Sequence, residues 1–488
     1  MSYRHVQVAC LLAVAVHLLP LLLADYFYMD DSWRAQLAGN AWAGEGRVLN
    51  DWFYAALGFS ASAPNLFPLP LLLAAIASAL ALARLARHYF AVPSVGALLV
   101  VLPLWFNPYF LQNLSYQYDG PTMALALAAC VLAITLEPRH ARALAGGALL
   151  VAVAMAFYQV SLNVFAGLCC VEVLRQVLAG NGFRQVGWQA LGRLGQLLGG
   201  CLLYFLSAYQ LMTPLRQGLL PFDAHWPATV GQRLGLIAER VGLLLTPATG
   251  TLAAVLLALA LAALALAAWR VARGPASLPA RLGLLLALWL PLPLVVLLVP
   301  GLTLLFSDFN DGARTLMGLG VLLLLLALLA HDLLRRLRLG WLLVVPLLCM
   351  LSFAYAYGRV LVVQKELHQA VTFTLAHDIA ADPRLAAARR YYVLDIGSSG
   401  QWLPAAQGSY TAMPALRYVL NINYLLLPEM MPRVGLSNFG SHPPLDRQQV
   451  LARSPQPLAR GKFYAIHLVD DVAYVLMRTP QDPEGFSW

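Results

Sequence analysis

The sequence predicts an all-α membrane protein that crosses the bilayer many times and carries a small α+β domain at its C-terminal end. Of the 488 residues, 60% are hydrophobic and only 11% are charged. The mean hydropathy of +0.69 excludes an ordinary soluble domain. Apolar runs such as "LLLALWLPLPLVVLLVPGLTLLF" lack the alternating pattern of barrel strands, so we expect the spans to be helices.

The apolar runs of residues 1–357 predict about eleven transmembrane helices, at about 20 residues for each span. We place them near residues 6–24, 66–85, 91–106, 121–136, 143–157, 160–178, 195–213, 250–269, 282–304, 314–330 and 341–357. The arginines of the connecting loops fall on one side of these spans, which identifies that side as the cytoplasm. Most acidic residues of the membrane region fall on the opposite side, and membrane insertion does not explain this clustering.

The composition changes at about residue 358, where we expect a soluble α+β domain that extends to residue 488. The stretch "QKELHQAVTFTLAHDIAADPRLAAARR" has the pattern of an amphipathic helix, and "YYVLDIG" that of a short strand. Near the end, "KFYAIHLVDDVAYVLMR" predicts two strands joined by a hairpin turn. An odd number of spans places this domain outside the cytoplasm.

Several classes of function are disfavoured by what the sequence lacks. It contains no phosphate-binding loop, no dinucleotide-binding glycine motif and no zinc-protease motif. All six cysteines fall inside predicted spans, where they cannot form a C-x-x-C metal site. The net charge of +9 is spread through short loops as orientation requires, so it does not indicate a nucleic-acid partner.

The first outer loop, "DYFYMDDSWRAQLAGNAWAGEGRVLNDWFYAALGFSASAPN", predicts two short interfacial helices separated by a "GEG" break. Asp30 and Asp31 stand at the start of the first helix. One interpretation is structural, with Asp30 as the N-cap and Asp31 stabilised by the helix dipole and by Arg34. Two adjacent carboxylates at a membrane surface exceed what capping requires, so we favour a functional role.

Four further residues stand out. Asp119 in "SYQYDGP" precedes Pro121 and is either a turn residue or a member of a site at the mouth of the helices. Tyr158 and Gln159 lie between two spans with almost no loop, where they face a cavity or cap the helices. Arg314 in "NDGARTLMG" is expected at the outer end of a span, where it requires an anionic partner such as a phosphate or an aspartate.

The runs "YMDDSWRAQLAGNAWAGEGRVLNDWFYAAL", "FPLPLLLAAI", "FNPYFLQNLSYQYDGPTMALAL", "AFYQVSLNVF" and "NDGARTLMGLG" together resemble the type II Gtr family of serotype-converting O-antigen glucosyltransferases. The resemblance covers most of the membrane region in the same order. It implies a GT-C-like polytopic enzyme of the bacterial inner membrane. Such an enzyme takes a hexose, usually glucose, from undecaprenyl phosphate and acts on the periplasmic side. The C-terminal domain is less diagnostic, so the acceptor is left open between O-antigen, a pilin and another envelope glycan.

The resemblance and the residue chemistry together assign candidate roles. A phosphate leaving group is already a stable anion, so one base suffices for an inverting displacement. We expect Asp31 to be this base, narrowly ahead of Asp30, with Asp119 as the third catalytic candidate. The candidate donor phosphate ligands are Arg314, Arg34 and Arg47, and the candidate substrate contacts are Tyr116, Tyr118, Trp33, Tyr158 and Gln159. No cofactor or metal is assigned, although Asp308 and Asp311 have ligand chemistry suited to a divalent cation.

The main rival class is a transporter or flippase of a lipid-linked sugar, which shares the spans, the arginines and a need for membrane lipid. A transporter is expected to show paired halves or ionisable residues deep in its spans. Neither is evident in the sequence. A purely structural envelope protein is a third possibility, and it leaves the carboxylates of the first loop without a purpose.

Overall fold

The computed structural model describes residues 2–92, 94–213 and 218–480. The chain divides into two compact units. The first contains Met1–Leu23 and Arg34–Tyr355, and the second contains Ala24–Trp33 and Ala356–Trp488. The second unit therefore combines the C-terminal region with the short segment that carries Asp30 and Asp31.

Eight helical segments of the described residues are long and apolar enough to cross a membrane. They contain α1 (Tyr3–Ala24), α4 (Leu69–Tyr89), α10 (Leu162–Leu178), α11 (Phe183–Leu206), α13 (Pro247–Ala272), α14 (Leu278–Trp289) with α15 (Pro291–Leu297), α16 (Gly318–Leu334) and α17 (Val344–Ala381). A helix of 22 residues such as α1 is roughly 33 Å long, which matches the hydrocarbon core of a bilayer. The protein is thus a helical membrane protein.

Shorter apolar helices complete the first unit. They are α5 (Val95–Val101), α6 (Pro103–Phe106), α8 (Asp119–Thr135) and α9 (Ala141–Phe157). Short polar or amphipathic elements connect them: α2 (Asp31–Leu37), η1 (Ala43–Glu45), α3 (Val48–Gly58), α7 (Phe110–Ser115), η2 (Gln159–Ser161), η3 (Ala208–Leu211), α12 (Trp226–Gly242), η4 (Gly301–Leu305), η5 (Ala313–Thr315), η6 (Arg335–Leu337) and η7 (Gly340–Leu343). The elements α2 and α3 confirm the two short helices predicted in the first outer loop.

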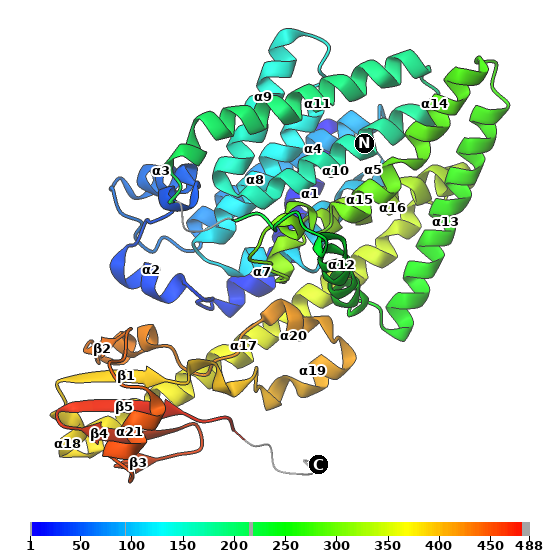
Figure 1. The fold of residues 1–488 in the computed structure, drawn as a ribbon. Coiled ribbons are helices and arrows are strands. Elements are labelled where there is room, and N and C mark those ends of the chain that lie inside the picture. The colour runs from blue at the N-terminus through cyan, green and yellow to red at the C-terminus, as the bar shows by residue number, and fades with distance from the viewer. Residues whose placement is uncertain (1, 93, 214–217, 481–488) are drawn as a thin grey trace. The chain divides into compact units, whose positions relative to one another are not determined.

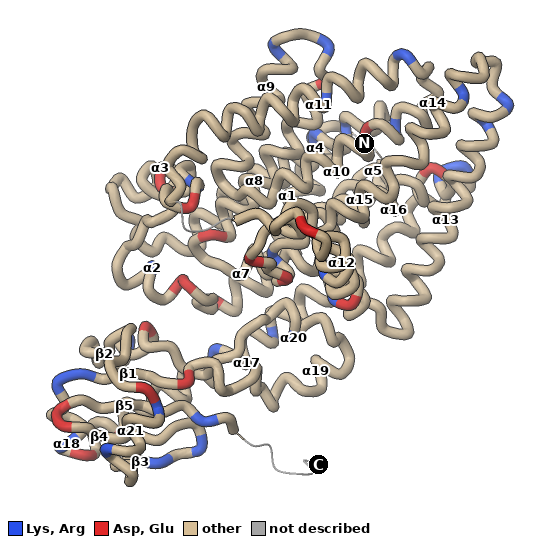
Figure 2. The backbone as a smooth tube through the Cα atoms, in the orientation of Figure 1, with Lys and Arg blue, Asp and Glu red and all other residues tan. Residues whose placement is uncertain are grey.

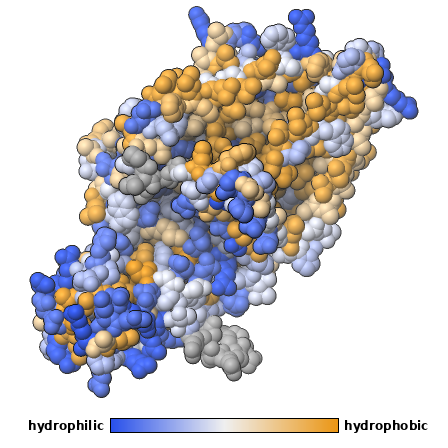
Figure 3. Space-filling model, in the orientation of Figure 1, coloured by the Kyte–Doolittle hydropathy of each residue, from blue (hydrophilic) through white to orange (hydrophobic). Residues whose placement is uncertain are grey.

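Helix α8 lies at the centre of the first unit and is buried along nearly its whole length. It packs against α4 and α9, and α9 packs in turn against α11 (Figure 1). A second group of helices is formed by α10, α13 and α16. Apolar side chains cover much of the face of the first unit that Figure 3 shows, as expected for a lipid-facing surface.

Charged residues separate along the helices of the first unit. Figure 2 shows most Lys and Arg at the end where α9 meets α11 and α13 meets α14, and most Asp and Glu near α3, α7 and α12. This is the asymmetry from which the sequence predicts the cytoplasmic side.

The second unit contains a five-stranded sheet with the order β2-β1-β5-β4-β3. Its strands are β1 (Arg390–Leu394), β2 (Phe439–Gly440), β3 (Ala459–Arg460), β4 (Tyr464–Val469) and β5 (Val472–Met477), and its short helices are α18 (Pro383–Ala386), η8 (Ile396–Ser399), η9 (Pro404–Ala406), α19 (Gln407–Ala412), α20 (Ala415–Leu420), η10 (Pro428–Val434) and α21 (Arg447–Arg453). Strand β1 runs parallel to β2 and β5, whereas β4 is antiparallel to β3 and β5. The predicted hairpin is confirmed by the pairing of Tyr464 with Met477.

Several predicted boundaries are wrong. The span near 195–213 begins at Phe183, because Arg184 and Arg193 lower the hydropathy of a segment that is nevertheless helical. The span near 282–304 is two helices, because Pro291 lacks the backbone N–H that a continuous helix needs. The span near 341–357 continues without a break to Ala381. The count of eleven spans stays a prediction.

One sequence inference requires correction, because ionisable side chains do lie within the helices. Glu172 of α10 is 1% exposed and pairs with Arg175 at 2.6 Å and with His88 at 3.3 Å. His17 of α1 is fully buried beside Phe106, with ring centroids 4.5 Å apart. The Glu172 group is internally compensated, which is the usual arrangement for a charge kept inside a helical membrane protein.

Candidate active site

Asp119 is the centre of a buried ion-pair network in the first unit. It is the first residue of α8, and its side chain is 6% exposed. Its Oδ1 accepts a hydrogen bond from the indole Nε1 of Trp42 at 2.8 Å. Two guanidinium nitrogens lie at 3.5 Å, Arg34 Nε beside Oδ2 and Arg47 Nη1 beside Oδ1. Both oxygens of the Asp119 carboxylate are therefore engaged by cations.

Trp42 organises the network from the loop before α3. Its ring stacks on Tyr54 with a centroid separation of 5.3 Å and an interplanar angle of 13°. The guanidinium carbon of Arg34 lies 4.2 Å from the Trp42 ring centre, within the range of a cation–π contact. Stacking and ion pairing together fix the plane of the Arg34 side chain.

Arg47 connects Asp119 with the junction between α9 and α10. Its Nε donates to the Gln159 Oε1 at 3.2 Å, and its Nη1 lies 3.2 Å from Glu45 Oε2. The guanidinium carbon stands 5.0 Å from the centre of the Tyr158 ring. Its side chain is 22% exposed, so this cation is partly accessible. The polar pair at the α9–α10 junction thus faces Arg47.

Arg314, in η5, joins the same group through Tyr158. Its Nη1 donates to the Tyr116 hydroxyl at 2.7 Å, and its backbone N–H donates to Gln112 Oε1 at 2.6 Å. The Tyr158 hydroxyl donates to the Arg314 carbonyl at 3.4 Å. Tyr158 therefore contacts both Arg314 and Arg47. We call Arg34, Arg47 and Arg314, together with Asp119 and Tyr158, the arginine cluster.

Tyr118 lies behind the arginine cluster. It is 2% exposed and packs with Trp42 and Tyr54, whose hydroxyl donates to the Tyr118 carbonyl at 2.8 Å. A direct contact of the Tyr118 ring with a sugar would require this packing to open. In this packing, Tyr118 supports the side chain of Trp42.

Asp30 and Asp31 belong to the second unit. Asp31 begins α2, is fully buried, and accepts a hydrogen bond from the Tyr28 N–H to its Oδ2 at 2.9 Å. Asp30 precedes the helix and is exposed. The donor of this hydrogen bond lies before the helix, whereas the capping interpretation assigns the cap to Asp30; Arg34, the expected neighbour of Asp31, pairs with Asp119. The capping interpretation stays a prediction. Burial raises the pKa of Tyr424, and the negative charges of Asp31 and Asp30 raise it further.

The predicted site residues thus fall into two groups. The first unit contains eight of them: Arg34, Arg47, Asp119, Tyr158, Gln159, Arg314 and Tyr116, which the structure brings together, and Tyr118, which packs against Trp42. Asp30, Asp31 and Trp33 belong to the second unit. A shared site for Asp31 and Asp119 stays a prediction.

Sequence reasoning missed three residues of the segment "AWAGEGRVLND" beside the arginine cluster, namely Trp42, Glu45 and Asp51. Burial raises the pKa of Asp51 above its ordinary 3.8, while hydrogen bonds from the backbone of Ala43 and Trp42 and the charge of Arg34 oppose this rise. The high density of aromatic and charged residues in this loop is the sequence signal that could have indicated these three residues. Elsewhere in the unit, Asp311 pairs with Arg240 at 2.9 Å.

The helices and the arginine cluster define a polytopic membrane protein with a buried site of paired arginine and carboxylate side chains. The model of the family described as "Glucosyl transferase GtrII" matches residues 19–330. The chain belongs to this family, which places it among the glucosyl transferases. The matched residues contain every member of the arginine cluster as well as Asp30 and Asp31.

A weaker similarity connects the chain with an uncharacterised 55.3 kDa protein encoded in the gtrB 5′ region of Salmonella phage P22. The two are 27% identical over 205 residues, which cover 42% of this chain and 41% of the phage protein. The matched region thus spans less than half the length of that relative. No solved structure matches the chain.

Proposed function

We propose that this protein transfers glucose from undecaprenyl phosphate to an envelope glycan such as O-antigen, on the periplasmic side of the bacterial inner membrane. The arginine cluster carries the proposal. Two guanidinium groups, of Arg34 and Arg47, lie beside the Asp119 carboxylate, and a third, of Arg314, joins them through Tyr158, at the end of the helices opposite the arginine-rich loops. Guanidinium groups bind phosphate through paired, charge-assisted hydrogen bonds.

The cluster suits a donor whose leaving group is a phosphate. As the bond from the anomeric carbon to the phosphate oxygen breaks, negative charge grows on that oxygen. Arg47, whose guanidinium lies over the Tyr158 ring, and Arg314, whose carbonyl accepts from the Tyr158 hydroxyl, are the residues proposed to stabilise this charge. Asp119 acts as a positioning residue here, because both of its oxygens are held by Arg34, Arg47 and Trp42.

An apolar groove in the first unit supports a lipid-linked donor. It has a volume of about 760 Å³ and is lined by α10, α11, α14, α15 and η4. Its lining extends from Phe183, at the start of α11, to Leu305, at the end of η4. Gly283 permits the close approach of α14, because a Cβ at this position would stand 2.3 Å from the Phe183 ring. A prenyl chain fits such a surface by burying its own apolar area.

The acceptor hydroxyl requires a base. In the proposed step, its oxygen attacks the anomeric carbon, its proton passes to the carboxylate of Asp31, and undecaprenyl phosphate leaves from the opposite face. This single displacement inverts the anomeric configuration. Asp31 is the favoured base because both oxygens of Asp119 already lie beside cations, Arg34 and Arg47.

The proposal is tested by incubating the purified protein with undecaprenyl phosphoglucose and with lipopolysaccharide from a strain that lacks the gene. We expect glucose on the polysaccharide and no transfer from a nucleotide-linked glucose. Absence of transfer from the lipid-linked donor, or equal transfer from the nucleotide sugar, would contradict the proposal.

The topology has its own test. A reporter that is active only in the periplasm, fused after Trp488, should give signal, because the arginine asymmetry and the predicted odd number of spans favour a location of this end outside the cytoplasm. Signal from a cytoplasm-only reporter would overturn the periplasmic placement.

A further inference from the structure

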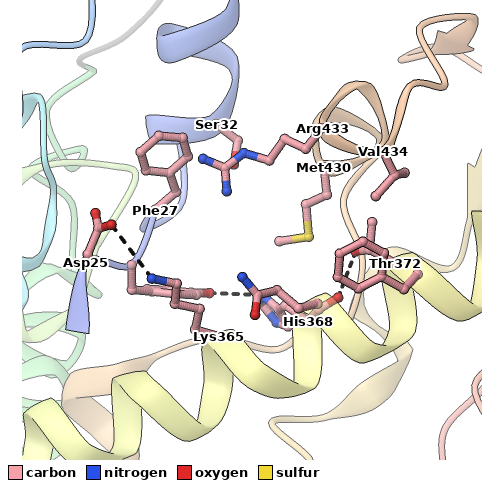
Figure 4. A pocket seen from close by; sticks show the side chains of 12 residues that line it. Asp25, Phe27, Ser32, Lys365, His368, Thr372, Met430, Arg433 and Val434 are labelled. Atoms are coloured by element: carbon pink, nitrogen blue, oxygen red, sulfur yellow. Dashed lines mark hydrogen bonds and ion pairs between the residues drawn. The ribbon is translucent and has the colours of Figure 1, made fainter. Parts of the chain in front are cut away.

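A cavity of about 430 Å³ lies wholly within the second unit. Three stretches of chain form it: the segment before and at the start of α2, the helix α17, and η10 (Figure 4). None of the predicted site residues lines it. The volume falls within the range of small-ligand pockets, which bind through a few placed polar groups among apolar ones.

Two cations face this cavity against one carboxylate. The Lys365 Nζ lies 3.7 Å from Asp25 Oδ2 and donates to the Ala24 carbonyl at 3.2 Å. The Arg433 guanidinium stacks 3.9 Å from the centre of the Phe27 ring, and within the described residues it makes no ion pair or hydrogen bond. Figure 4 shows the Arg433 side chain extending toward Ser32. The cavity therefore has an excess of positive charge and one cation free to bind an anion.

The guanidinium of Arg433 is only partly compensated by its surroundings. Burial lowers the pKa of Arg433, while the charge of Asp25 raises it. A bound anion would supply the hydrogen bonds and the negative charge that replace lost water.

The remaining lining suits a sugar ring. Ser32, Gln369 and Thr372 provide hydroxyl and amide groups, and Thr372 donates its own hydrogen to the His368 carbonyl at 2.7 Å, which leaves its oxygen able to accept. Phe373 lines the same space and is 62% exposed. A sugar presents hydroxyl groups at its rim and C–H groups on its faces, so it can use both kinds of lining.

One residue of the cavity lining is next in the chain to the candidate base, Asp31. Ser32 lines the cavity and directly follows Asp31 in α2. Asp31 is held by the backbone of Tyr28, whose hydroxyl donates to the Leu420 carbonyl at 2.6 Å. Candidate base and cavity therefore belong to one packed unit, whereas the arginine cluster belongs to the other.

We propose that this cavity is an acceptor subsite that binds an anionic sugar, one that carries a phosphate or a carboxylate, through Arg433 and Lys365. The assignment rests on the proposed glucosyl transfer. It adds that the acceptor is recognised by a charged unit of the glycan, separately from the donor phosphate. Anionic phospholipid headgroups share this chemistry, and the experiment below separates the two sources.

The binding test uses the full-length protein in phosphatidylcholine nanodiscs, with an Arg314→Gln background to suppress the proposed donor site. Glucose 1-phosphate, glucose and inorganic phosphate serve as probes, and saturation-transfer NMR reports the dissociation constants. We expect glucose 1-phosphate to bind at least about tenfold more tightly than glucose or phosphate, since it alone combines a charge-assisted contact with the contacts of a sugar ring. Arg433→Gln and Lys365→Gln should each weaken it by about tenfold.

Two variants control for folding. Arg433→Lys keeps the charge and should retain most of the binding. Arg460→Gln removes an exposed arginine of β3 and should change nothing. Equal binding of glucose and glucose 1-phosphate, or unchanged binding in Arg433→Gln, would overturn the proposal. Loss of sugar phosphate binding when phosphatidylglycerol is added would identify a lipid headgroup site instead, which also overturns it.

Turnover separates this proposal from the proposed function. In glucosyl transfer, Arg433→Gln should raise the acceptor KM about tenfold and leave the donor KM and kcat nearly unchanged. Transfer with an unchanged acceptor KM would refute the subsite while the enzyme activity stands. Absence of transfer by the wild-type protein would refute the proposed function, and the binding experiment would still decide whether the cavity binds anionic sugars.

Discussion

The arginine cluster of the first unit and the cavity of the second unit both place cations beside aromatic rings, but they compensate the charge differently. In the cluster, Arg34 and Arg47 are matched to Asp119 and are held by Trp42 and Tyr158. In the cavity, Arg433 has the Phe27 ring beside it and, among the residues that the structure describes, no carboxylate at hydrogen-bond distance.

This difference indicates two kinds of recognition. A cation fixed by several partners is preorganised, so it can hold a reacting phosphate in one place with little loss of side-chain entropy. A cation with few partners has its charge compensated by the bound ligand. Such a site therefore favours any acceptor that carries a suitable negative charge. The proposed division of labour is therefore a donor site in the first unit and acceptor binding in the second.

The largest expected effect is the loss of turnover when the candidate base is replaced. Asp31→Asn should lower turnover by roughly 10²- to 10⁴-fold, the usual contribution of a general base. The amide oxygen can still accept the hydrogen bond from Tyr28, so expression and donor binding should remain close to wild type. Steady-state transfer assays with Asp30→Asn in parallel identify the base. If each variant keeps most of the wild-type rate, the base is a different residue.

Asp119→Asn should act mainly on stability. Removing one partner of a buried ion pair leaves uncompensated charge; Arg47 keeps Glu45, but for the buried Arg34 we expect a loss of about 3 kcal/mol in the free energy of unfolding. Thermal denaturation in detergent measures this. Asp471→Asn, which breaks an exposed pair with Arg389, is the matched control and should change stability by less than about 1 kcal/mol. A stable Asp119→Asn protein with no turnover would instead make Asp119 the base.

Arg314 should affect donor use. Arg314→Ala removes a charge-assisted contact with the phosphate, which contributes about 1.5–3 kcal/mol, so donor kcat/KM should fall by roughly ten- to a hundredfold. Arg314→Lys keeps the charge without the planar fork and should give a smaller loss. The acceptor KM should change little. A drop in protein yield that matches the drop in activity would show that Arg314 holds the fold through Tyr116.

The smallest expected effect concerns Asp51. Because burial raises its pKa in the folded protein, this group stabilises the fold below pH 3.8 and loses that contribution as the pH rises through the folded pKa. Asp51→Asn should therefore remove a decline in stability between acidic and neutral pH. Unfolding temperatures across this range check the sign. A variant that becomes less stable than wild type as the pH rises would contradict it.

Local sequence patterns predicted much of the fold. Hydropathy placed α1, α4 and α13 to within a few residues, because each is a long apolar run bounded by charged or turn residues. Strand alternation and the turn at Asp470 and Asp471 predicted the β4–β5 hairpin. The start of α11 was missed because Arg193 is buried and donates to the carbonyls of Ile134 and Leu136, a contact that no local pattern reveals.

The site was less predictable, because its contacts join residues far apart in the chain. The sequence singled out Arg34, Arg47 and Asp119, yet the hydrogen bond from Trp42 to Asp119 crosses 77 positions. The grouping of residues 24–33 with the C-terminal region has no local signal either. Lys365 is one of only two lysines in the chain, and this rarity is a sequence signal that could have indicated the cavity.

The proposed division of labour is tested most directly by measuring donor and acceptor KM in a matched pair of variants, Arg314→Gln and Arg433→Gln, under one set of assay conditions. We predict a crossed result: Arg314→Gln raises the donor KM about tenfold or more and spares the acceptor, whereas Arg433→Gln raises the acceptor KM and spares the donor. If both variants raise the same constant, or raise both constants equally, the two units do not bind separate substrates and the central claim is wrong.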